Sequence, residues 1–207
     1  MQSIDAAMFL WLTAGPDASS AMVLLAGFLA SAVVPLFAIL LAILWVRGNP
    51  LWRGLLLDAV AAGLIGLGAV QVIGWLHYRP RPFEVGLGRN LMHHLPENSF
   101  PSDHATLMFA LAFALIAATA TRRFGTVILL LAGAVAWSRV FLGAHYPLDM
   151  LGGAALGLLA VTLVCRVPGR ARLWAWLDAV YEAVLRRLNL PRSVFPRRAE
   201  AASRNAR

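Results

Sequence analysis

The amino-acid sequence predicts an all-α integral membrane protein, a bundle of roughly five to six helices with about five transmembrane spans and short interfacial helices. Of its 207 residues, 60% are hydrophobic and only 14% are charged, and the mean hydropathy is +0.71. A soluble domain is usually nearer to half apolar and a quarter charged. The length allows one domain, in which a span of about 20 apolar residues could occur roughly five or six times.

Charge and cysteine content narrow the possible functions. The net charge is +8, all cationic side chains are arginine, and ten of the 18 arginines lie at or after Arg166. We interpret this basic tail as a topology signal that is attracted to anionic lipid headgroups, and we expect no nucleic-acid partner. The single cysteine, Cys165, excludes an intramolecular disulfide and a cysteine-built metal site.

The N-terminal segment, residues 1–20, is predicted to be interfacial. Its apolar stretch is too short to span a bilayer, and Gly15-Pro16-Asp17 would end any helix that continued out of it. The absence of a cationic start argues against a secretory signal peptide. We therefore expect a short interfacial helix with Trp11 at headgroup level.

The transmembrane domain is expected to comprise residues 21–167. Pro35 should kink the first span, and small residues crowd the last span, as close helix packing in lipid requires. Asp58, near the start of the second span, is expected either to snorkel or to pair with the nearby Arg53. The expected spans are residues 21–46, 54–76, 103–121, 124–142 and 148–164.

The segment from residue 168 to 207 is predicted to be a basic, amphipathic, cytoplasmic tail. Apolar residues, including Trp174 and Trp176, recur at helical spacing among arginines, which indicates a helix on the membrane surface. From Pro191 onward the chain is basic and low in apolar residues, so we expect it to be disordered.

Arginine counts predict the topology. The loops around residues 47–53 and 122–123 carry arginine pairs and belong with the tail on the cytoplasmic side. The N-terminus, the loop 79–102 and the loop 143–147 then face the exterior. Arginines that remain on this unfavoured side invite a functional interpretation.

Three polar islands interrupt the apolar sequence, and all of them fall on that outer side. They are Arg79-Pro80-Arg81-Pro82-Phe83, Phe100-Pro101-Ser102-Asp103-His104, and the segment from Ser138-Arg139 through His145 to Asp149. Segments distant in sequence are thereby expected to converge on one face at one membrane depth.

The residue types in these islands suit the binding and transfer of phosphate. Arginine matches phosphate oxygens with a planar fork, and Ser102 could add hydrogen bonds at a helix N-terminus. Arg139 lies inside an apolar span, where ionisable residues are expensive and generally functional. Asp149, four residues after His145, could accept a hydrogen bond from one ring nitrogen and leave the other free to attack phosphorus. His104 could protonate the leaving oxygen.

Several of these residues also permit a simpler interpretation. Arg79 is equally compatible with a headgroup anchor, and Ser138 with helix packing. We interpret His77, His93 and His94 as interfacial polar groups. A metal site fits poorly, because His104 and His145 lack an obvious further ligand beyond Asp103 and Asp149.

These residues resemble the type 2 phosphatidic acid phosphatase superfamily, whose motifs are K-x6-R-P, P-S-G-H and S-R-x5-H-x3-D. The third motif is complete as Ser138-Arg139, His145 and Asp149. The second reads Pro101-Ser102-Asp103-His104, with Asp103 in place of glycine. The first keeps Arg81-Pro82, but Gly74 stands at the spacing of its lysine. If Arg79-Pro80 is used instead, Val72 stands there.

With R-P-R-P-F, P-S-D-H and no motif lysine, the chain looks like the undecaprenyl-diphosphatase branch. That resemblance implies a phosphohistidine on His145, orientation of His145 by Asp149, and acid catalysis by His104. It implies no metal or other cofactor. The predicted substrate-binding residues are Arg81, Ser102, Asp103, Arg139, Arg79 and Ser138. Among these, Arg79 is the candidate substitute for the lysine, and Asp103 would repel phosphate unless it is turned away or paired.

The sequence therefore predicts a metal-independent membrane diphosphatase on the outer face of a bacterial inner membrane. Its expected substrate is a polyprenyl diphosphate lipid, undecaprenyl diphosphate, and its partners are that lipid and the membrane. Phosphatases of phosphatidylglycerophosphate, phosphatidic acid or lipid A are the alternatives. A non-catalytic lipid binder or transporter is disfavoured, because such a relative would be expected to lose His145 or Asp149. The sequence predicts no oligomeric state.

Overall fold

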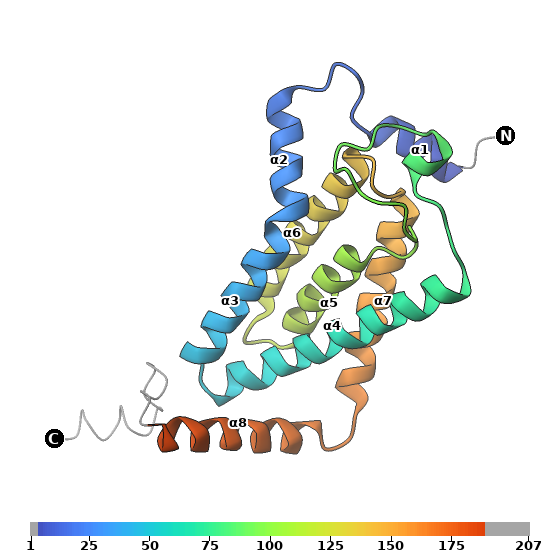
Figure 1. The fold of residues 1–207 in the computed structure, drawn as a ribbon. Helices are drawn as coiled ribbons and strands as arrows, with labels where there is room; N and C mark the ends of the chain where they lie inside the picture. Colours follow the sequence, from blue (N-terminus) through green and yellow to red (C-terminus); the bar gives the residue numbers. More distant parts are fainter. Residues whose placement is uncertain (1–3, 189–207) are drawn as a thin grey trace.

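The computed structural model describes residues 4–188, and helices are the only regular secondary structure among these residues, which confirms the predicted class. Residues 1–3 and 189–207, including the expected disordered end of the tail, lie outside the described residues. The central helix is α5 (Asp103–Ala117), and it packs against α4 (Pro50–Leu76), α6 (Arg122–Phe141) and α7 (Pro147–Arg166) (Figure 1).

Within residues 4–188, three helices are long and apolar enough to cross a membrane: α4, α6 and α7. A fourth crossing is formed if α2 (Ser20–Ser31) and α3 (Val33–Arg47), which meet at a 44° bend, act as one span. Pro35 lies in the first turn of α3, where its ring blocks the helical hydrogen bond to the preceding turn. The predicted kink of this span is thereby confirmed.

The remaining expected span, α5, is shorter than predicted. It ends at Ala117 rather than Thr121, because Ala118 adopts an extended backbone and the Thr121 hydroxyl donates to the Leu115 carbonyl oxygen at 2.7 Å. Its 15 residues measure about 22 Å, less than the roughly 30 Å of a hydrocarbon core. The longer helices around it form the wall of the bundle (Figure 1).

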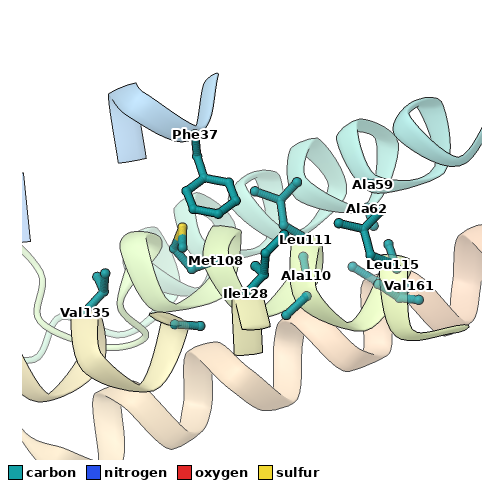
Figure 2. Packing of buried hydrophobic residues seen from close by; sticks show 14 of the residues in the cluster. Phe37, Ala59, Ala62, Met108, Ala110, Leu111, Leu115, Ile128, Val135 and Val161 are labelled. Atoms are coloured by element: carbon teal, nitrogen blue, oxygen red, sulfur yellow. The ribbon is translucent and has the colours of Figure 1, made fainter. Parts of the chain in front are cut away.

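Glycines allow α5 and α7 to approach closely. A Cβ atom on Gly153 would lie 2.9 Å from the Ser102 carbonyl oxygen, and one on Gly157 would lie 2.7 Å from the Ala110 nitrogen. The expected packing of small residues in the last span is therefore present, and it draws the start of α5 against the start of α7. Side chains such as Phe37, Met108 and Leu111 fill the adjoining apolar core (Figure 2).

The predicted amphipathic helix is α8 (Arg170–Arg187), which lies across one end of the bundle (Figure 1). Arg53 and Asp58 on α4 do not pair with each other. Arg53 is fully buried and binds Asp178 at 2.8 Å and Glu182 at 2.6 Å, both on α8. Asp58 binds Arg170 and the indole nitrogen of Trp174 instead.

At the opposite end lies α1 (Ile4–Leu12), the expected short N-terminal helix (Figure 1). Phe9 on α1 is fully buried, and its ring meets the Tyr146 ring edge-on at 5.6 Å. The Ala14 N–H, just beyond the helix, donates to the Phe141 carbonyl oxygen at 2.8 Å. Trp11 is exposed, as a residue at headgroup level would be.

Candidate active site

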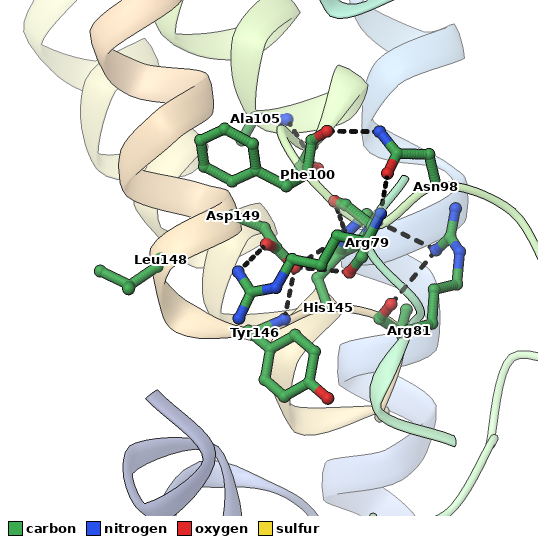
Figure 3. Close-up of polar contacts among 12 residues, drawn as sticks. Arg79, Arg81, Asn98, Phe100, Ala105, His145, Tyr146, Leu148 and Asp149 are labelled. Carbon is green, nitrogen blue, oxygen red and sulfur yellow. Dashed lines mark hydrogen bonds and ion pairs between the residues drawn. The ribbon is translucent and has the colours of Figure 1, made fainter. Parts of the chain in front are cut away.

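Residues from all three polar islands meet at the end of the bundle that lies opposite α8 (Figures 1 and 3). Their buried polar side chains are those of Arg81, Ser102, Ser138, Arg139, His145 and Asp149. A cavity of about 400 Å³ opens beside them. It is lined by Val70, Gln71, Gly74, Arg81, Glu97, Asn98, Pro101, Asp103 and His145.

His145 has one ring nitrogen fixed and the other facing cationic groups. Its Nδ1 lies 3.0 Å from the Ser99 carbonyl oxygen, which can only accept, so Nδ1 carries the hydrogen and Nε2 the lone pair. Asp149 Oδ2 lies 3.6 Å from Nδ1. The hydrogen bond from Nδ1, which was expected to go to Asp149, thus goes to the Ser99 carbonyl oxygen. Asp149 acts on the His145 ring mainly through its charge.

The surroundings of His145 favour its neutral form. Burial lowers the pKa of His145, the nearby charges of Arg139 and Arg81 lower it further, and Asp149 opposes them. A neutral imidazole with a free lone pair is the form that can attack phosphorus.

Arg81 stands beside the attacking nitrogen. Its Nη1 lies 3.2 Å from His145 Nε2 and also donates to the Ala144 carbonyl oxygen. The Arg81 backbone N–H donates to the Glu84 carboxylate at 2.9 Å, which fixes the start of the 3₁₀ helix η1 (Pro82–Val85). A phosphate brought to Nε2 would therefore meet the Arg81 guanidinium.

Asp149 is held by three donors (Figure 3). Its Oδ1 accepts from Arg79 Nη1 at 2.6 Å, and its Oδ2 accepts from the Ser99 hydroxyl at 2.6 Å and from the Tyr146 N–H at 2.7 Å. The structure thus brings Arg79 to Asp149 rather than to the lining of the cavity. Gly74, at the spacing of the absent lysine, does line the cavity, and Asn98 packs over it.

Asp103 and His104 form a pair at the N-terminus of α5. Asp103 Oδ1 lies 3.0 Å from His104 Nδ1, so the carboxylate is paired, and its partner is a histidine. Both side chains are partly exposed, and Asp103 lines the cavity. With Nδ1 directed at Asp103, Nε2 is the His104 nitrogen that remains for a leaving oxygen.

Two of the predicted binding residues have mainly local contacts. Ser102 caps α5 by accepting from the Ala105 N–H, and Ser138 donates to the Val135 carbonyl oxygen within α6. Arg139 is buried, and its Nη1 donates to the Met92 sulfur at 3.7 Å. The contacts of Ser138 agree with the helix-packing alternative.

Three buried nitrogen atoms near the cavity have no hydrogen-bond partner within the described part of the chain. They are Arg81 Nε, Arg139 Nε and His94 Nε2. Burial and the charges of Arg139 and Arg81 lower the pKa of His94 to about 4, so this ring is neutral near pH 7. The interfacial interpretation of His94 missed its position beside these arginines.

Sequence reasoning also missed Ser99, Asn98 and Asp5. Ser99 contacts both His145 and Asp149, while the Asn98 side chain accepts from the Arg79 N–H at 2.8 Å. Asn98 and Ser99 directly precede the second island in the sequence, and this position was the only sequence feature that could have indicated their role. Asp5 lies far from every island in sequence, and no motif spacing pointed to it. Within residues 4–188 no cluster of three or more His, Cys, Asp and Glu residues could hold a metal.

The fold and the site together define a class. A multi-pass bundle of apolar helices that buries two arginines and an oriented histidine at one end has the fold and the site residues expected of a membrane phosphatase. Residues 55–173 match the family model of the PAP2 superfamily, and the chain belongs to that superfamily.

Named relatives agree with this assignment. The chain is 32% identical over 193 residues to "Putative undecaprenyl-diphosphatase YbjG" of Escherichia coli (strain K12), covering 90% of this chain and 97% of the relative. It is 29% identical over 162 residues to undecaprenyl-diphosphatase BcrC of Bacillus subtilis (strain 168), covering 78% and 83%. The fold is similar to the crystal structure of Aquifex aeolicus LpxE, with a TM-score of 0.66, 20% identity, and coverage of 80% of this chain and 97% of that one.

Proposed function

We propose that this phosphatase hydrolyses undecaprenyl diphosphate to undecaprenyl phosphate and phosphate through a phosphohistidine on His145. The observation that carries the proposal is the geometry of His145, whose Nδ1 is held by Ser99 and whose Nε2 adjoins Arg81 and the cavity. The names of two curated relatives support the choice of lipid.

In the first step, His145 Nε2 attacks the terminal phosphorus and the bond to the bridging oxygen breaks. Arg81 exchanges its contact with Nε2 for a phosphate oxygen, and His104 gives a proton to the leaving undecaprenyl phosphate. The phosphorylated ring gains positive charge, which the Asp149 carboxylate at 3.6 Å stabilises. In the second step, His104 takes a proton from water, the resulting oxygen attacks phosphorus, and the N–P bond breaks to release phosphate and neutral His145.

The lipid chain would follow the two helices that line the cavity. Together with α3, these two helices, α4 and α5, also border an apolar groove of about 150 Å³ that contains Phe37, Leu64 and Leu107. A prenyl chain in this groove would leave its diphosphate beside Arg81. We further propose that the cavity faces the exterior of a bacterial inner membrane, because arginines concentrate at the α8 end.

The decisive experiment measures phosphate release by purified protein in detergent with EDTA. Undecaprenyl diphosphate should be hydrolysed in preference to phosphatidylglycerophosphate and phosphatidic acid. His145→Ala should reduce kcat by about 10³-fold or more, whereas His77→Ala, at the exposed end of α4, should not. Preference for a glycerolipid would reject the proposed substrate, and metal-dependent turnover would reject the mechanism.

The covalent intermediate has its own readout. Brief exposure to substrate labelled with radioactive terminal phosphate should give an acid-labile, base-stable phosphoprotein. The label should be absent from His145→Ala. A fully active enzyme that never acquires label under rapid quenching would favour direct attack by water.

A further inference from the structure

We propose that Asp5 on α1 is a positioning residue for the reaction, acting on His145 through Arg79 and Asp149. The inference rests on the proposed function of His145. It extends the site beyond residues 55–173, the part of the chain that matches the superfamily model, because α1 lies before that region.

Hydrogen bonds connect Asp5 to the site in two steps. The buried Asp5 carboxylate accepts from Arg79 Nη2 at 2.5 Å through Oδ2 and from the Leu148 N–H at 3.0 Å through Oδ1. The other end of the same guanidinium, Nη1, donates to Asp149 at 2.6 Å. Arg79 therefore bridges two buried carboxylates. Figure 3 shows Arg79 with Asp149 and Tyr146, and the guanidinium carbon lies 4.2 Å from the centre of the Tyr146 ring.

This bridge has an electrostatic consequence. Arg79 alone would neutralise Asp149, and the phosphorylated His145 ring would then lose its counter-charge. A second carboxylate at Asp5 makes the group of Asp5, Arg79 and Asp149 net negative. The negative charge that remains beside His145 raises its pKa and stabilises the positive phosphohistidine.

Contacts other than those of Asp5 also hold α1 in place. Phe9 packs against Tyr146 and approaches Gly88 so closely that a Cβ there would lie 2.7 Å from the ring. The Thr13 hydroxyl and the Ala14 N–H both bond to the Phe141 carbonyl oxygen. These contacts remain in an Asp5 variant, so a change in chemistry can be separated from unfolding.

Charged and titratable groups from every surrounding element lie around the His145 site. They are Asp149 on α7, Arg139 on α6, Asp103 and His104 on α5, Asp5 on α1, and Arg79, Arg81, His94 and Glu97 in the connecting loops. Asp5→Asn changes one charge in this set and leaves the others in place. Removal of that negative charge should lower the pKa of His145.

The test compares the full-length protein with Asp5→Asn, Asp5→Glu and a matched control, Asp17→Asn, whose side chain is exposed between α1 and α2. Hydrolysis of undecaprenyl diphosphate is measured across pH in detergent. We expect Asp5→Asn to lower kcat by about 10- to 100-fold with KM within about twofold, and to move the acid limb of the rate profile to lower pH. Asp5→Glu should restore part of the rate, and Asp17→Asn should match wild type.

A double variant tests the route of the effect. If Asp5 acts through Arg79, then Asp5→Asn combined with Arg79→Gln should be no slower than Arg79→Gln alone. Additive losses, a wild-type kcat in Asp5→Asn, or a loss confined to KM with an unmoved acid limb would overturn the proposal.

A measurement without substrate separates this proposal from the proposed function. Titration of ¹⁵N-histidine-labelled protein by NMR should place the pKa of His145 lower in Asp5→Asn than in wild type, with His145→Gln identifying the signal. An unshifted pKa rejects the Asp5 inference whatever the substrate is. Failure of wild type to hydrolyse undecaprenyl diphosphate, together with a shifted pKa, rejects the substrate alone.

Discussion

At the scale of single residues, a backbone carbonyl makes the hydrogen bond to His145 that the sequence motif assigns to the Asp149 side chain. The carbonyl of Ser99 holds His145 Nδ1, while Asp149 is engaged by Arg79, Ser99 and Tyr146. Motif spacing could predict that His145 and Asp149 lie together, because four residues at a helix start stay within reach of each other. It could not predict a carbonyl from another loop, since every residue carries one.

These contacts separate two substitutions that a motif would treat alike. Asp149→Asn removes the counter-charge of the phosphohistidine and turns an amide toward the donors that held the carboxylate, so we expect kcat to fall by about 10³-fold or more. Ser99→Ala keeps the carbonyl and loses only the hydroxyl bond to Asp149, so a loss of about tenfold or less is expected. Both are measured as kcat with undecaprenyl diphosphate. Equal losses would show that the Ser99 hydroxyl is as important to the reaction as the Asp149 carboxylate.

At the scale of helices, apolar periodicity predicted the elements well and their partners poorly. Residues 124–142 and 148–164 correspond closely to α6 and α7, and Pro35 marks the bend between α2 and α3. The end of α5 was set by a Thr121 hydroxyl contact, which has no periodic signature. Arg53 and Asp58 stand close in sequence, but their partners come from α8, more than 100 residues away.

The contact between α4 and α8 predicts where stability resides. Arg53→Ala leaves Asp178 and Glu182 largely buried without their cation, and we expect a loss of about 3 kcal/mol in the free energy of unfolding. The exposed Arg47→Ala should change little by comparison. Thermal unfolding in detergent measures both.

A compensated variant tests the cause of that loss. Arg53→Met combined with Asp178→Asn and Glu182→Gln removes all three charges and should recover much of the stability. If the triple variant is as unstable as Arg53→Ala, packing of the Arg53 side chain against Trp45 and Tyr181 is the larger contribution. Because the site lies at the other end of the bundle, kcat below the unfolding temperature should stay near wild type in each variant.

At the scale of the whole molecule, the three islands were predicted to meet at one end, and the structure brings them together there. The prediction followed from counting crossings, which places alternate loops on the same side of a membrane. Counting crossings could not predict that α1 contributes Asp5 to the site. A short interfacial helix does not cross the membrane, and its position is fixed only by the loops against which it packs.

The proposed orientation has a direct test with single cysteines in a Cys165→Ser background. Leu95→Cys lies in the exposed loop near the cavity, and Arg123→Cys lies at the start of α6. An impermeant maleimide applied to intact spheroplasts should label Leu95→Cys and leave Arg123→Cys unmodified, and inverted vesicles should give the opposite pattern. Labelling of Arg123→Cys from outside would reverse the proposed topology.

The bond between Asp5 and the Leu148 backbone joins residues that are 143 positions apart. During synthesis on the ribosome, α1 emerges first, and its carboxylate must remain without this partner until the start of α7 has been made and inserted. A nascent chain that stops after α6 already contains Arg79, Arg81, His104 and Arg139. It still lacks His145 and the Leu148 N–H that donates to Asp5. Under the proposed mechanism, hydrolytic activity therefore arises late in biogenesis, once α7 has been made and α1 packs against its start.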